Sequence, residues 1–124
     1  MWIKIGDRLY QANDSSRVKF RTTFSKRLLE ELRALAEKNH TYANYLLETG
    51  LEKTLRQNEF VKDQFKRPTD RIQYKTTFDK DLLNIVRKYA KDKNVSINDI
   101  MEYSVKNIDL QNAKSSSHRF RVEE

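Results

Sequence analysis

Polar side chains occupy every second position in two short stretches of this chain. The six alternating residues are Lys19, Arg21, Thr23, Gln73, Lys75 and Thr77. A period of two places the members of each stretch on one face of an extended strand. Their side chains donate hydrogen bonds and carry no negative charge, and a two-stranded β-ribbon fits the major groove of B-DNA, where base edges accept such bonds. We call these six residues the donor face, and their chemistry favours recognition of duplex DNA.

The charge of the whole chain also fits a polyanionic partner. Lysine and arginine outnumber aspartate and glutamate by 25 to 18, which gives a net charge of +7 over 124 residues. The chain has no cysteine, two glycines and two isolated histidines. It therefore lacks a thiol nucleophile, a glycine-rich phosphate loop and a cluster of metal ligands. We predict a protein that is not an enzyme and uses no cofactor or metal.

The sequence carries no signal for a membrane. No apolar run approaches the roughly 18 residues of a membrane-spanning helix, and residues 1–10 do not have the pattern of a signal peptide. The lack of cysteine is compatible with a reducing compartment. We expect a cytoplasmic, nucleoid-associated protein with no membrane partner.

The sequence segment that contains the donor-face residues occurs twice in the chain. Segments 17–54 and 71–108 align without a gap at an offset of about 54 residues. Identical pairs include Thr23/Thr77, Phe24/Phe78, Asn44/Asn98 and Glu48/Glu102. One such unit is too small to bury its own apolar face, so the two copies should fold against each other.

Each copy has the pattern of a strand followed by two helices. Ser25 and Asp79 are expected N-caps of helices whose apolar residues recur at helical spacing, and a capping box at 96–99 opens the last helix. Because an isolated strand leaves both edges unpaired, we expect 17–24 and 71–78 to pair antiparallel over the helices. The residues expected to face the core are Phe20, Phe24, Tyr74 and Phe78.

We therefore predict a mainly α fold with a two-stranded antiparallel β-ribbon, formed by two units intertwined in one chain. Residues 17–110 should form one composite domain. Its expected parts and flanks are an N-terminal extension with the pattern of a short hairpin (1–16), a first unit (17–56), a linker that begins as a helix extension (57–70), a second unit (71–110) and a flexible basic tail (111–124).

This pattern resembles the ribbon-helix-helix family of DNA-binding proteins, which includes the methionine and Arc repressors. The resemblance covers each repeat over its full length. It rests on the alternating strand, the capped helix and the loop Asn94-Val95-Ser96-Ile97-Asn98 before the last helix. It implies that the donor face contacts base edges. Family members are usually homodimers that often bind DNA side by side. The resemblance therefore implies that this chain is a monomeric pseudo-dimer in solution and that two such molecules can pair side by side on DNA.

The resemblance also implies that the N-termini of the second helices bind DNA phosphates, in agreement with the anion preference of a helix N-terminus. The corresponding residues are Thr41, Tyr42 and Asn44 in the first copy and Ser96, Ile97 and Asn98 in the second. Tyr42 departs from the pattern, because it stands at the position of Ser96.

Cations beside the two strands are expected to contact further phosphates. These residues are Arg17, Lys26, Arg27, Arg71 and Lys80. Asp79 and Asp81 dilute the positive charge beside the second strand. We therefore expect the first half of the protein to hold DNA more strongly, with an affinity that falls steeply with salt.

The two copies differ where DNA would be read. Lys19 in the first copy aligns with Gln73 in the second. Lysine and arginine prefer guanine O6 and N7, whereas glutamine prefers adenine N6 and N7. We predict a non-palindromic site with a guanine-leaning side under the first strand.

The function favoured by these features is transcriptional repression, in which the protein occupies an operator. One alternative is a DNA-binding accessory factor of the relaxosome, partition or antitoxin type. Another is a protein-interaction module without specific DNA binding, in which the ribbon or the N-terminal extension docks a partner. Contacts between molecules side by side on DNA would draw on Trp2, Phe60 or Phe65.

Overall fold

The computed structural model describes residues 2–5, 8–11, 17–111 and 113. Within these ranges the strands are β1 (Trp2–Ile5), β2 (Arg8–Gln11), β3 (Arg17–Ser25) and β4 (Arg71–Asp79). The α-helices are α1 (Lys26–Lys38), α2 (Ala43–Gln57), α3 (Lys80–Lys93) and α4 (Ile97–Ser104). Two 3₁₀ turns are η1 (Lys62–Gln64) and η2 (Val105–Asn107). Both copies of the repeat therefore follow the predicted order of strand, helix and helix.

Strands β3 and β4 form the antiparallel ribbon that the alternation predicts. The cross-strand pairs on the donor face are Lys19–Thr77, Arg21–Lys75 and Thr23–Gln73. The central pair, Arg21 and Lys75, consists of equivalent residues of the two copies. The register therefore relates the two strands by an approximate two-fold axis through the middle of the ribbon.

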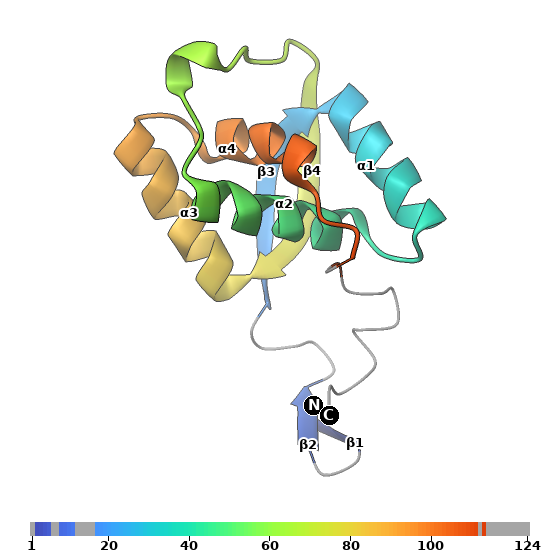
Figure 1. Ribbon diagram of the computed structural model, residues 1–124. Helices are drawn as coiled ribbons and strands as arrows, with labels where there is room; N and C mark the ends of the chain where they lie inside the picture. Colours follow the sequence, from blue (N-terminus) through green and yellow to red (C-terminus); the bar gives the residue numbers. More distant parts are fainter. Residues whose placement is uncertain (1, 6–7, 12–16, 112, 114–124) are drawn as a thin grey trace.

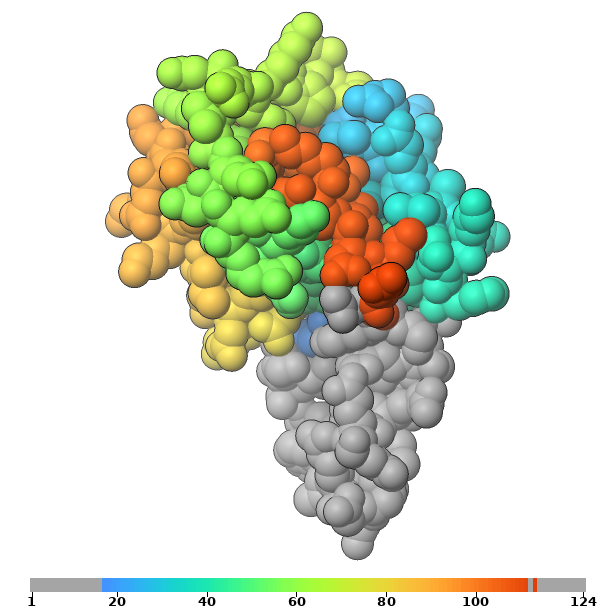
Figure 2. All heavy atoms as spheres, viewed as in Figure 1, coloured from blue at the N-terminus to red at the C-terminus, as the bar shows by residue number. Residues whose placement is uncertain are grey.

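The helices of the repeat cover the inner face of the ribbon. Helices α2 and α4 lie across it, and α1 and α3 lie to either side of them (Figure 1). The ribbon contributes Phe24, Tyr74 and Phe78 to the core, each at most 4 % exposed, and Phe20 packs against this core. Seen from the helical side, the molecular surface is made by the helices and the 58–70 segment (Figure 2). Because the core-facing residues alternate with the donor face along each strand, the donor face lies on the opposite side of the ribbon.

The helices begin where the sequence predicts caps. The side chain of Ser25 accepts a hydrogen bond from the backbone N–H of Leu28 at 3.3 Å, and the Asp79 carboxylate accepts one from Leu82 at 3.0 Å. The capping box of α4 is present, with the N–H of Ser96 donating to the Asp99 carboxylate at 3.2 Å. Ser25 and Asp79 are also the last residues of β3 and β4, so each of these two caps fixes where its strand ends and the helix begins.

The predicted helix extension after residue 57 is wrong. Helix α2 ends at Gln57, because Asn58 adopts a left-handed conformation with φ of 50° and its N–H closes on Thr54. The chain then buries Phe60, which is 2 % exposed and packs between the rings of Phe65 and Tyr103. Phe60 is therefore part of the core and is not available for contacts between molecules.

A close crossing of α2 and α4 lies beneath the ribbon. A Cβ atom at Gly50 would collide with the backbone carbonyl of Ser104, which is the equivalent residue of the second copy. Beside the crossing, the hydroxyl groups of Thr54 and Ser104 lie 2.8 Å apart, and Asn107 donates to Thr54 at 2.9 Å. The missing side chain at residue 50 thus sets the distance between the two helices.

The helices are short. The longest, α2, has 15 residues, fewer than the roughly 20 that cross a bilayer. Among the described ranges of the chain, none of the helices has the length and apolar character of a membrane span.

The N-terminal extension contains the expected hairpin. Strands β1 and β2 pair antiparallel, with Trp2 opposite Gln11 and Ile5 opposite Arg8. Residues 12–16, and the predicted tail 111–124 apart from residues 111 and 113, lie outside the described ranges.

Candidate nucleic-acid interface

The structure brings the six donor-face residues together on the outer face of the ribbon, as the alternation predicts. Five of them are exposed and Thr77 is partly buried. Each end of the face combines residues from both strands, because the ribbon is antiparallel: Lys19 lies opposite Thr77 at one end, and Gln73 lies opposite Thr23 at the other. The difference between the copies therefore runs along the ribbon from end to end, and not from one strand to the other.

The centre of the donor face is a pair of like charges. Arg21 and Lys75 stand directly opposite each other, an arrangement that destabilises an antiparallel pair. Within the described ranges, neither of these residues nor Lys19 forms an ion pair or a hydrogen bond through its side chain. A surface with this repulsion and no acidic partner is stabilised by a bound polyanion.

The N-termini of α2 and α4 lie at opposite ends of the donor face. The Nδ2 atom of Asn98 donates to the hydroxyl of Thr23 at 2.9 Å, and that of Asn44 donates to the carbonyl of Thr77 at 2.9 Å. Each asparagine thereby joins the second helix of its own copy to the strand of the other copy. Two helix N-termini, which favour anions, thus flank the exposed ribbon.

The residues predicted to clamp phosphate differ in accessibility. Thr41 and Asn44 are buried, at 7 % and 8 % exposure, and the Asn44 amide is bonded to Thr77. These two side chains therefore do not fit the predicted phosphate contact. Tyr42 is 38 % exposed and Ser96 is exposed. The remaining two predicted residues, Ile97 and Asn98, are half-buried.

Arg17 and Arg71 do not fit their predicted role as phosphate contacts. The Arg17 side chain is 6 % exposed, pairs with Glu48 at 3.2 Å and lies over the ring of Tyr45 at 5.0 Å. The Arg71 side chain is 21 % exposed and pairs with Asp99 at 2.7 Å and with Glu102. Both guanidinium groups are drawn inward, because buried carboxylates neutralise them there.

Two buried glutamates hold the ends of the ribbon, a role that the sequence did not reveal. The Glu48 carboxylate, which binds Arg17, also accepts the backbone N–H of Asp79 at 2.8 Å. The equivalent Glu102 binds Arg71 and accepts the N–H of Ser25, also at 2.8 Å. Each glutamate therefore ties the first residue of its own strand to the last residue of the partner strand. The available signal was the identity of these acidic residues at equivalent positions in apolar helices.

The other predicted phosphate contacts remain at the surface. Lys26, Arg27 and Lys80 are exposed. Arg27 makes an exposed ion pair with Glu31 at 3.0 Å, which is worth little in water and yields readily to a phosphate. These three cations follow the ends of the two strands, where α1 and α3 begin.

A carboxylate beside the second arginine is held ionised. Burial raises the pKa of Asp99, but hydrogen bonds from Arg71, Arg67 and Ser96 outweigh this effect and keep the pKa below its ordinary value. The Asp99 side chain is 1 % exposed, and Arg67 binds it at 3.0 Å. Asp99 therefore links the 58–70 segment and β4 to the start of α4.

Acid is expected to destabilise the protein in part through Asp99. Because its pKa is lower in the folded state, the carboxylate stabilises the fold fully above about pH 4, and this contribution is lost as the pH falls toward the folded pKa. Asp99→Asn should lower the free energy of unfolding at pH 7 by about 1–3 kcal/mol. Urea unfolding of wild type and variant between about pH 7 and pH 3 should show the gap closing as acid is added.

The exposed Asp81→Asn change is the matched control, because it removes the same charge without breaking a buried ion pair, and it should lower the free energy of unfolding at pH 7 by less than about 1 kcal/mol. A gap between wild type and Asp99→Asn that stays constant down to pH 3 would contradict the prediction.

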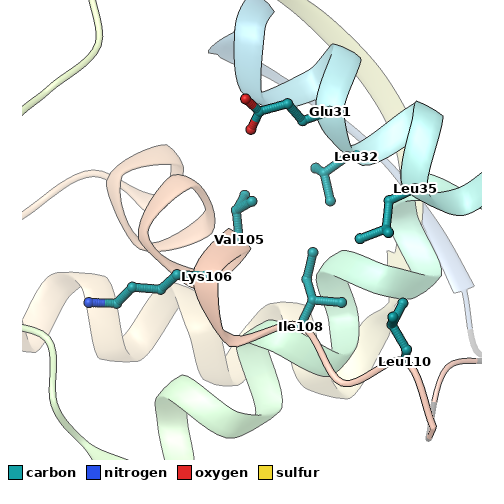
Figure 3. A pocket seen from close by; sticks show the side chains of 7 residues that line it. All are labelled: Glu31, Leu32, Leu35, Val105, Lys106, Ile108 and Leu110. Carbon is teal, nitrogen blue, oxygen red and sulfur yellow. The ribbon is translucent and has the colours of Figure 1, made fainter.

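Two grooves lie among the helices, away from the donor face. The first, of about 220 Å³, is bordered by Leu32, Leu35 and Ile108, while Lys106 points away from it (Figure 3). The second, of about 550 Å³, lies between α2 and α3. No donor-face residue lines either groove. The lining of the first groove is mostly aliphatic, whereas the second is also lined by Thr49, Glu52, Arg56 and Asp109. Because neither groove adjoins the cations of the donor face, the ribbon is the stronger candidate site.

Comparison of the chain with protein-family models, with curated proteins and with solved structures found no match.

Proposed function

We propose that this protein binds duplex DNA sequence-specifically by inserting the donor face of its ribbon into the major groove. The observation that carries the proposal is the central pair of opposed cations, Arg21 and Lys75, exposed on a ribbon without an acidic partner in the described chain. Arginine and lysine side chains bind guanine O6 and N7, and a two-stranded ribbon fits the groove that presents them. The anion-favouring N-termini of α2 and α4 at the two ends suit the phosphates that border the groove.

The DNA-binding body is a pair of intertwined ribbon-helix-helix units in one chain, and thus a monomeric pseudo-dimer. Four contacts between the copies support this part of the proposal. Asn44 and Asn98 reach the strand of the other copy, and Glu48 and Glu102 do the same through backbone N–H groups. A free single unit would lose all four contacts.

The target is a non-palindromic site. One end of the donor face carries Lys19 and the other Gln73, with the two central cations between them. Lysine favours guanine and glutamine favours adenine. The register thus moves the expected guanine-leaning side from one strand to one end of the ribbon, and the protein binds its site in one orientation.

Repression is the role that fits a protein of this size and chemistry. A bound repressor blocks access to a promoter by occupying the DNA, which requires affinity and specificity but no catalytic group. The basic charge supplies a salt-dependent affinity for any duplex, and the donor face supplies the preference among sequences.

Replacing the two central cations is the experiment that tests the proposal. Binding sites are first selected from random duplex DNA with the wild-type protein. Arg21→Ala/Lys75→Ala should then weaken binding to the selected site by about 30-fold or more, because each side chain contributes roughly 1–3 kcal/mol. Fluorescence anisotropy measures the affinity, and circular dichroism confirms that the variant is folded.

The matched control is Lys88→Ala/Lys91→Ala on α3, which removes the same charge from exposed positions outside the ribbon. It should change the affinity by less than about threefold, since salt screens charges more than about 10 Å from the DNA. If wild type enriches no sequence, or if both double variants bind the selected site equally well, the proposal is wrong. The chain would then be a protein-interaction module without specific DNA binding.

A further inference from the structure

The two threonines at the ends of the donor face are equivalent in sequence but are held differently. The hydroxyl of Thr77 lies 3.3 Å from Arg17 Nε and 3.3 Å from Asn44 Nδ2. The same two side chains also donate to its carbonyl, at 3.0 and 2.9 Å. The hydroxyl of Thr23 accepts from Asn98 alone among the described residues, at 2.9 Å.

This difference changes what each threonine can offer to a base. A hydroxyl group has one proton to donate and two lone pairs that accept. Both partners of Thr77 approach as N–H donors, so its lone pairs are occupied and only its proton remains. Thr23 keeps one lone pair as well as its proton. Thr77 is therefore a donor only, whereas Thr23 can donate or accept.

The different bonding of the two threonines arises from a buried position at which the two copies carry different residues. Asp99 attracts Arg71 at 2.7 Å and so turns it away from Thr23. The equivalent residue in the first copy is Tyr45, whose ring lies 5.0 Å from the guanidinium of Arg17 and leaves that arginine directed at Thr77. The exchange of a carboxylate for an aromatic ring thus decides where the arginine of each copy points.

We propose that Arg17 and Asn44 are positioning residues that make Thr77 discriminate against cytosine, while Thr23 tolerates all four bases. The inference rests on the proposed DNA binding and adds a rule for the two ends of the site. Cytosine presents only an N–H donor in the major groove, whereas guanine, adenine and thymine each present an acceptor. A donor-only hydroxyl cannot pair with cytosine, but a hydroxyl with a free lone pair can.

Selection from random duplex DNA, read out as base preference at each position, tests the inference. Thr77→Val and Thr23→Val keep the β-branched shape and remove the hydroxyl, so each variant identifies the position that its threonine reads. In wild type, cytosine should be disfavoured about tenfold at the Thr77 position and less than about threefold at the Thr23 position. Asn44→Ala frees one lone pair of Thr77 and should bring its cytosine penalty down to the Thr23 level.

Asn98→Ala is the matched control, because it frees a lone pair on a threonine that already has one, and it should leave both preferences unchanged. Equal cytosine penalties at the two ends in wild type, or an unchanged profile in Asn44→Ala, would overturn the inference and leave DNA binding intact. Failure of wild type to enrich any sequence would overturn the proposed function itself. If Asn44→Ala does not fold by circular dichroism, the comparison of wild type with the two valine variants decides alone.

Discussion

Replacing Gly50 with alanine is expected to lower the free energy of unfolding by about 3 kcal/mol or more. A methyl group there collides with the backbone carbonyl of Ser104 and lies 3.2 Å from its carbon and 3.5 Å from the nitrogen of Ile108. Backbone atoms cannot rotate away as a side chain would, so α2 and α4 must separate. Urea unfolding, followed by circular dichroism, measures the change.

The direction of the change in stability distinguishes the steric clash from the effect of helix propensity. In an ordinary helix, alanine is favoured over glycine by about 1 kcal/mol, so propensity alone predicts a more stable variant. Glu52→Ala, at an exposed position of the same helix, should change stability by less than about 0.5 kcal/mol. Truncating the neighbour in Gly50→Ala/Ser104→Gly should not restore stability, because the obstacle is the carbonyl group. A stabilised Gly50→Ala protein would show that the helices do not cross as described.

Removing the Glu102 carboxylate is the second change with a large expected effect. Glu102→Ala should cost about 3–5 kcal/mol of unfolding free energy, since it takes one partner from a buried ion pair. The side chain is fully buried; it binds Arg71 Nε at 3.1 Å and accepts the N–H of Ser25 at 2.8 Å. The substitution leaves a buried N–H without its acceptor and loosens the end of the ribbon.

Two further variants separate the charge from the hydrogen bond. Glu102→Gln can still accept the N–H of Ser25 and should lose less stability than Glu102→Ala. Arg71→Met and Glu102→Ala each remove the same Arg71–Glu102 interaction, so the double variant that combines them should be more stable than the sum of the single changes predicts. Strict additivity in this double-mutant cycle, measured by urea unfolding, would argue against a coupled pair.

Periodicity predicted the parts of the fold in which local pattern and tertiary contact agree. Phe24 and Phe78 alternate with the donor face and therefore had to lie on the opposite side of the ribbon. Ser25 and Asp79 are the last residues of their strands and cap the helices through neighbouring backbone groups. These features depend on residues within a few positions of one another, so the spacing of residue types in the sequence is enough to predict them.

Sequence patterns were less informative for side chains whose direction is set by distant residues. Arg17 and Arg71, as isolated cations at strand ends, have the pattern of exposed phosphate contacts. Their actual partners, Glu48 and Glu102, lie 31 residues further along the chain. A similar limit applies to residues 57–70, where Phe60 lies among polar and charged neighbours in the sequence but packs in the core against the distant Tyr103. Which strand residues share an end of the donor face likewise depended on the register.

The contact between Gly50 and Ser104 affects which copies of the repeat can pair with each other. In a dimer of identical subunits, residues at equivalent positions are the same on both sides of the axis. Two first copies would bring together two glycines without the hydroxyl that Thr54 contacts, and two second copies would replace Thr54 by its equivalent, Ile108. Each copy therefore fits the other better than it fits itself. The two halves of one chain should therefore pair with each other in preference to the equivalent halves of a second molecule.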